Sequence, residues 1–97
     1  MGYAYMIFEW IKSKIPHCIY VKKRLNDDIL IVTSKDLIIY YLNPTAASFF
    51  NYVDGKSSIN DIKKRFLNDF DVTESELEQD LINLVRDLQW KQLIVLE

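Results

Sequence analysis

The sequence is poor in the residues that cross-link or interrupt a chain. Its 97 residues include one cysteine, one histidine, two glycines and two prolines. A single cysteine excludes an intramolecular disulfide. We interpret Cys18 as a free thiol in a reducing cytoplasm, with an intermolecular pair left open. Because a structural zinc needs about four ligands and a catalytic zinc about three, Cys18 and the adjacent His17 make a poor metal site. We therefore expect no metal and no cofactor.

The scarcity of glycine and proline also leaves no low-complexity linker, so we expect one domain with one core. The chain is 49% hydrophobic and 27% charged, as is ordinary for a globular protein. A net charge of −2 gives no electrostatic reason to expect a nucleic-acid partner. The apolar run near the N-terminus is too short for a membrane span, and the start lacks the features of a signal peptide. We expect a cytoplasmic protein with no membrane span.

The first half of the chain contains candidate strands. Residues 29–33 and 37–42 are rich in β-branched and aromatic residues and are joined by a short polar turn. A first strand is predicted at residues 19–21, before a basic run at 22–24 and a polar turn at 26–28. Together they predict an antiparallel three-stranded meander. Its first and third strands would be edges, and exposed edges are natural templates for another strand.

Strand-like sequence changes to helix-like sequence at residues 42–45. Asn43 can cap a helix and Pro44 suits the first helical position, where a missing N–H costs nothing. The helix should end near Val53, with Gly55 providing the left-handed conformation at its C-terminus.

Two further helices are predicted from their capping residues. One begins at Ser58 with Asp61 three residues later, and its buried stripe extends to Phe70 while residues 63–65 form its solvated side. The last helix, residues 74–89, begins at Thr73. A short closing segment follows it, over residues 90–96.

The N-terminal residues form a separate pattern. Residues 3–15 place apolar side chains three and four apart, which predicts an amphipathic helix ended by Pro16. Three interpretations are open: a helix on a membrane surface, a docking helix for a partner, or a helix packed on its own domain or on a second copy. We expect residues 1–16 to be an extension and residues 17–97 the main domain.

The last helix has an apolar stripe wider than one line of core contacts requires. Either the helix is well buried, or one shoulder of the stripe lines a groove beside the neighbouring strand. An extended peptide could then bind by β-augmentation, pairing its backbone with the strand edge. The line is Leu77, Leu81, Leu84 and Leu88, flanked by Ile82 and Val85 on one shoulder and by Asp80 and Asp87 on the other.

Strands followed by short helices also fit a winged-helix DNA-binding protein, whose last helix enters the major groove. Here the last helix is acidic and would repel phosphates. The basic runs at residues 22–24 and 63–65 keep this alternative open. No nucleophile–base pair or carboxylate dyad is visible, so we predict no catalytic residues.

Four segments together resemble the PqqD-like family of peptide recognition elements: residues 40–47, 54–56, 59–62 and 70–72. The resemblance covers residues 19–96. It implies an α+β fold, winged helix-turn-helix-like, with a three-stranded antiparallel sheet followed by three helices. It also implies a non-catalytic protein that binds the leader of a ribosomally made precursor peptide. The leader would be presented to a modifying enzyme, such as a radical SAM protein or a leader protease.

The resemblance places the leader beside the third strand and against the last helix. By strand alternation, either Leu37, Ile39 and Tyr41 or Ile38, Tyr40 and Leu42 face the core. Family members tend to keep an aromatic residue at Tyr40 and a leucine at Leu42, so we assign the second set to the core face. We expect apolar contacts from Ile82 and Val85, and we expect Val85→Asp to weaken leader binding while leaving the fold intact. A homodimer is left open. The candidate peptide-binding residues are Leu37, Ile38, Ile39, Tyr40, Tyr41, Asp80, Leu81, Ile82, Leu84, Val85, Asp87 and Leu88.

Overall fold

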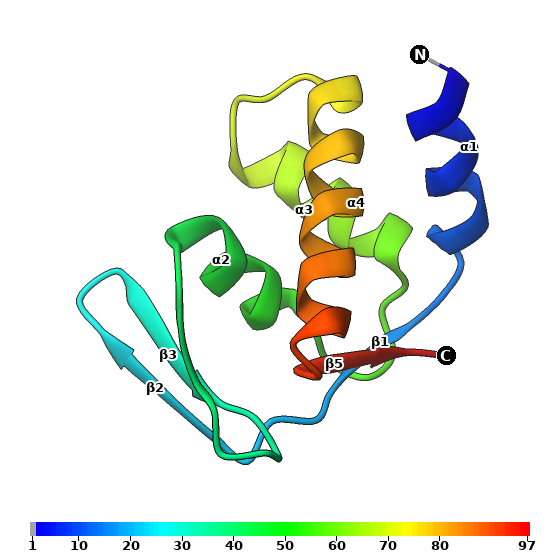
Figure 1. Cartoon of the computed structure of the whole chain (residues 1–97). Coiled ribbons are helices and arrows are strands. Elements are labelled where there is room, and N and C mark those ends of the chain that lie inside the picture. Colours follow the sequence, from blue (N-terminus) through cyan, green and yellow to red (C-terminus); the bar gives the residue numbers. More distant parts are fainter. Residues whose placement is uncertain (1) are drawn as a thin grey trace.

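The computed structural model describes residues 2–97, with side chains from residue 7 onward. A three-stranded antiparallel sheet projects to one side of a group of helices (Figure 1). This confirms the predicted α+β fold. Within the described residues, no helix is both long enough and apolar enough to cross a membrane. In chain order the elements are α1 (Gly2–Ile11), β1 (Pro16–Cys18), β2 (Lys22–Asn26), β3 (Ile29–Thr33), β4 (Ile39–Leu42), α2 (Pro44–Tyr52), α3 (Ile59–Asp69), α4 (Glu74–Trp90) and β5 (Ile94–Leu96).

The sheet has the order β2-β3-β4, so β2 and β4 are its edges. Successive side chains alternate between its two faces. On β4, Leu42 is buried and Tyr40 packs against the core, while Ile39 and Tyr41 are exposed. The predicted inward set is therefore confirmed for Tyr40 and Leu42 and is wrong for Ile38, which is 49% exposed and lies before β4.

The first strand of this sheet lies later than predicted. Residues 19–21 are outside any strand, and the basic run 22–24 lies within β2. The N–H of Ile19 donates to the carbonyl of Leu93, which extends the pairing of β1 with β5. The segment Lys22–Asn26 has weak strand propensity, but it pairs along its whole length with β3. Pairing with a partner strand outweighs local propensity here.

The third strand is also shorter than predicted, because Leu37 and Ile38 belong to the turn before it. Leu37 has a left-handed φ of 65° and its N–H donates to the carbonyl of Ser34. The Ser34 side chain accepts a hydrogen bond from the N–H of Ile38. Local hydrogen bonds of this kind compete with strand pairing.

The N-terminal helix ends at Ile11, four residues earlier than Pro16 alone would require. The carbonyls of Lys12 and Lys14 accept hydrogen bonds from Asn60 and Ile59 at the start of α3. These bonds satisfy N–H groups that the first turn of any helix leaves free. The predicted extension of this helix to residue 15 is wrong, because the backbone carbonyls beyond Ile11 accept hydrogen bonds from α3. Predicted side-chain positions 3 and 6 lie outside the described side chains.

The predicted helix starts are confirmed. The Asn43 side chain accepts from Ala46 N, the Ser58 side chain from Asp61 N, and the Thr73 side chain from Glu76 N. Ser58 and Asp61 complete a reciprocal capping box.

The expected glycine closure of α2 is wrong. Val53 ends the helix in an extended conformation, and Gly55 belongs to the next turn, where Asp54 Oδ1 accepts from Lys56 N and Ser57 N. At the end of α4, Gln92 has a φ of 59°, and β5 then pairs with β1.

Candidate peptide-binding groove

The last helix, α4, has two opposite faces that meet different neighbours. Helical spacing groups residues 74, 78, 82 and 85 on one side and 80, 84, 87 and 91 on the other. We call these the α1-side face (Glu74, Glu78, Ile82 and Val85) and the β4-side face (Asp80, Leu84, Asp87 and Lys91). The leucines at 77, 81 and 88 lie between them and are buried.

The β4-side face approaches the free edge of the sheet. Lys91 Nζ lies 5.3 Å from the ring centroid of Tyr40, on β4. The same ammonium donates to Asp87 Oδ2 at 2.7 Å. Leu84 is partly buried against the core, one turn before Asp87. The edge strand β4 and the second half of α4 therefore stand next to each other, with Tyr40 between them.

An apolar pocket of about 180 Å³ lies further along this face. It forms where the start of α2, the end of α3 and the first half of α4 meet. Phe70 at the end of α3 is 46% exposed, and its ring lies 5.7 Å from that of Phe66. The sequence analysis placed Phe70 in a buried stripe, but its backbone is the extended C-cap, so the ring turns toward this pocket. The lining residues are Pro44, Thr45, Ser48, Phe66, Phe70, Val72, Leu77, Asp80, Leu81 and Leu84.

The α1-side face is closed. Ile82 and Val85 are only 2% and 1% exposed, and Leu88 is fully buried. Helix α1 packs against α4, and its Phe8 is itself buried. The structure therefore places the two apolar residues proposed as groove contacts in the core. It also overturns the expectation that Val85→Asp leaves the fold intact, since a charge there would be buried.

A buried lysine links α1, α3 and α4 beside this closed face. Lys63 Nζ donates to Glu74 Oε2 at 2.7 Å and to Glu78 Oε2 at 2.9 Å, and it lies 4.9 Å from the centroid of Phe8. Burial opposes the charge on the ammonium. The two hydrogen-bonded carboxylates outweigh burial, and they raise the pKa of Lys63. The hydrogen bond and positive charge of Lys63 lower the pKa of Glu74.

This ion pair corrects the prediction that residues 63–65 form one solvated basic side. Lys63 is 7% exposed and is bonded to carboxylates of the acidic helix. One cation of the basic run is thus unavailable to phosphates, which weakens the DNA-binding alternative. In the sequence, the only sign that Lys63 would be buried in an ion pair was its position on the side of α3 that faces a neighbouring helix.

The remaining predicted site residues divide between the groove and its surroundings. Asp80, Leu81 and Leu84 line the apolar pocket, and Asp87 lies beside Lys91. Ile39 and Tyr41 are exposed on the sheet face opposite Tyr40, and Leu37 and Ile38 are exposed in the preceding turn. The sequence analysis did not assign Lys91 or the α2 and α3 residues of the pocket, because these meet only when the helices pack.

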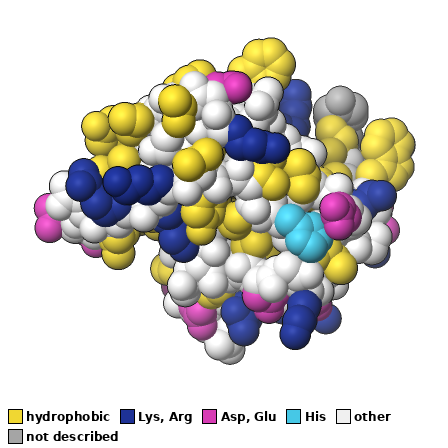
Figure 2. Space-filling view, turned by 90° about the horizontal axis from the view of Figure 1, so that it is seen from below, with side chains coloured by type: hydrophobic (Ala, Val, Ile, Leu, Met, Phe, Trp, Pro, Cys, Tyr) yellow, Lys and Arg dark blue, Asp and Glu magenta, His cyan; other side chains and the backbone are white. Residues whose placement is uncertain are grey.

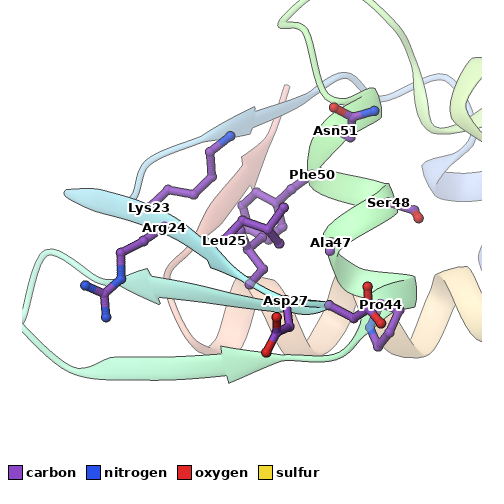
Figure 3. Close-up of a pocket in the computed structure, with 11 residues that line it drawn as sticks. Lys23, Arg24, Leu25, Asp27, Pro44, Ala47, Ser48, Phe50 and Asn51 are labelled. Atoms are coloured by element: carbon purple, nitrogen blue, oxygen red, sulfur yellow. The ribbon is translucent and has the colours of Figure 1, made fainter.

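A second hollow lies between the β2–β3 hairpin and α2 (Figure 3). It is larger, about 410 Å³, and its rim carries both Lys23 with Arg24 and Asp27 with Asp28. Figure 3 shows Lys23 on the strand side and Ala47 and Ser48 on the helix, while the guanidinium of Arg24 extends away from the helix. Its wide opening and mixed charges set it apart from the narrower apolar pocket. We take the β4-side face, the pocket and β4 as the candidate groove.

Comparisons with known proteins identify a family by sequence and similar folds among solved structures. The sequence model of the family described as coenzyme PQQ synthesis protein D (PqqD) matches residues 30–94. No curated protein matches the chain by sequence.

Two solved structures share the fold. TbiB1, solved in complex with the TbiA(beta) leader peptide, has a TM-score of 0.71 and 16% identity over 82% of this chain and 93% of its own. A lasso peptide synthetase B1 complexed with the leader peptide has a TM-score of 0.69 and 17% identity over 86% of this chain and 98% of its own.

Proposed function

This chain belongs to the PqqD family, and from that premise we propose that it is a non-catalytic recognition element for the leader of a ribosomally made precursor peptide. The observation that carries the proposal is an open sheet edge, β4, beside the β4-side face of α4. Both similar solved structures are complexes with leader peptides.

Binding by β-augmentation explains the parts of the groove. The leader backbone would pair with β4 as a further strand about 4.8 Å away. Every second leader side chain would then point toward α4 and meet Tyr40 and Leu84. One apolar leader side chain would enter the pocket beside Phe70. Asp80 stands at the rim of that pocket, and its carboxylate would attract a basic leader residue.

The rest of the proposal concerns the setting in which the leader is bound. The protein would act in the cytoplasm and present the leader to a modifying enzyme, of the radical SAM or leader-protease type. We keep the division into an extension, residues 1–16, and a recognition domain, residues 17–97. The contacts of α1 with α4 support a bracing role for the extension, on the side of α4 away from the leader.

The proposal is tested by an amide NMR titration with the leader of the small peptide encoded beside this chain. We expect saturable shifts in residues 39–42, 80–84 and 87–91, and small shifts in β2. The matched control is a scrambled leader of the same composition, which should leave the spectrum unchanged. An unchanged spectrum with the true leader, or larger shifts of Lys22, Lys23 and Arg24 with duplex DNA, would overturn the proposal.

A further inference from the structure

The face of the sheet that points away from the helices is apolar and uncovered among the described residues. Ile29, Ile39 and Tyr41 on this face are 38%, 56% and 71% exposed. Ile31, half-buried, lies between them on the central strand. The candidate groove uses the edge of β4 and the opposite face of the sheet. A leader paired with the edge of β4 would reach the outer face only through its alternate side chains, beside Ile39 and Tyr41, so most of this face lies outside the function proposed above.

The outer face also carries a one-sided charge. The strand register aligns Arg24 with Ile31 and Tyr41, and aligns Lys22 with Thr33 and Ile39. Directly paired residues lie on the same face of a sheet. These two rows of uncharged side chains thus each end in a cation on β2. Asn26 completes the outer positions of β2, and no Asp or Glu occupies an outward position on the three strands.

In the surface view, dark blue basic side chains lie beside yellow hydrophobic ones on the side of the molecule where the sheet projects, and magenta acidic side chains lie at the outer end of this part (Figure 2). Singly exposed apolar residues are normal, but a contiguous apolar surface rimmed by polar residues marks an interaction site.

We propose that this outer sheet face (Lys22, Arg24, Ile29, Ile31, Ile39 and Tyr41) is the docking surface for the modifying enzyme, and that the enzyme meets it with an apolar patch rimmed by carboxylates. The inference rests on the proposed function for the identity of its partner. The cationic edge of this face favours a partner with an acidic surface, because opposite charges speed association and like charges disfavour it. A second copy docked face to face would bring two cationic rows together. The leader uses the edge and the enzyme uses the face, so both can bind at once.

The test measures the affinity of the full chain for the enzyme encoded beside it, with leader affinity measured in parallel on the chain alone. Ile31→Glu places a carboxylate on the central strand, away from the leader edge and opposite Arg24, which can pair with it. We expect enzyme affinity to fall about tenfold or more, since an acidic rim would face a new like charge. Arg24→Glu should lower it severalfold and reduce its salt dependence.

Lys64→Glu is the matched control, because it reverses an exposed charge on α3 away from the sheet. It should change enzyme affinity less than about twofold. Unchanged enzyme affinity in Ile31→Glu, with leader binding intact, would overturn the docking inference and leave the proposed function standing. Absent leader binding in the unsubstituted chain would instead overturn the proposed function.

Two further results would also overturn the docking inference. One is an Ile31-dependent doubling of mass by sedimentation, which would assign the face to a second copy. The other is an Ile31-dependent affinity for phosphatidylglycerol vesicles without enzyme binding, which would assign it to a membrane surface.

Discussion

The two faces of α4 both flank the apolar stripe that the sequence predicted, but one face is buried and the other is open. The α1-side face has the better apolar residues, Ile82 and Val85, and both are buried. The β4-side face has two aspartates, one leucine and one lysine, and it borders the open strand edge and the apolar pocket. Apolar residues on the shoulder of a helix indicate that something packs there. They do not indicate whether the neighbour is a bound peptide or another helix of the same chain.

The largest expected effect comes from Val85→Asp, which tests the closed face. A carboxylate at a site 1% exposed would lose its hydration without gaining a partner. We expect the free energy of unfolding to fall by about 4 kcal/mol or more, measured by urea denaturation. Val85→Ile is the matched apolar control and should retain most of the stability. A folded Val85→Asp protein of normal stability would show that this face is open.

Removing the contact that Phe8 of α1 makes with α4 should cause the next largest loss of stability. Phe8→Ala deletes a buried ring that packs on α4 and lies over Lys63. Truncation of a buried phenylalanine costs about 3 kcal/mol or more, so the urea midpoint should fall clearly. Leader affinity of Phe8→Ala, measured without urea under conditions in which the variant is folded, should change little. A loss of leader affinity at unchanged stability would reverse the roles assigned to the two faces.

Leu84→Asp tests the open face. Leu84 is only partly buried, so we expect the fold to persist, with a modest loss of stability. Leader affinity should fall about tenfold, which is about 1.4 kcal/mol, because a charge would face the apolar pocket. Isothermal titration calorimetry with the leader measures the change. Asn83→Asp, at an exposed neighbouring position, is the control for added negative charge. Equal losses in the two variants would mean that charge alone, and no specific contact, is responsible.

The smallest expected effect is the pH dependence of the Lys63 ion pair. Because the pKa of Glu74 is lowered from 4.5, its contribution to stability is present above pH 4.5 and is lost as pH falls through the lowered value. The pKa of Lys63 is raised from 10.5, so its contribution is lost only as pH rises through that raised value. Thermal melts between pH 3 and 7 should show a shallower acid decline in Glu74→Gln than in the unsubstituted chain. Asp71→Asn, an exposed control, should keep the full decline.

Several features of the fold followed from short-range chemistry. The hydroxyl and amide side chains of Asn43, Ser58 and Thr73 cap the three helices that the sequence predicted. In each cap the partners lie within a few residues, so spacing alone is informative. On β4, strand alternation left two possible inward sets, and the family resemblance selected the one with Tyr40 and Leu42.

Features that depend on distant partners were missed or misplaced. The basic run in β2 is a strand because β3 pairs with it. Helix α1 ends early because the carbonyls of Lys12 and Lys14, just beyond it, accept hydrogen bonds from the start of α3. Lys63 is buried because two carboxylates of α4 reach it. None of these partners can be identified from periodicity, since periodicity gives the direction of a side chain and not its neighbour.

The sequence by itself determined the β3–β4 hairpin followed by three helices, the capped helix starts and a wide apolar stripe on α4, but not the pairing of β1 with β5. Tertiary structure decided which side of that stripe stays open. Helix α1 comes from the far end of the chain, packs on α4 and buries Ile82 and Val85. The other side meets β4, whose outer edge pairs with no strand among the described residues, and it borders the apolar pocket. The physical reason is that the hydrophobic effect has no direction. The sequence shows that the apolar side chains of α4 must be buried, and only the packing of the chain determines which element buries them.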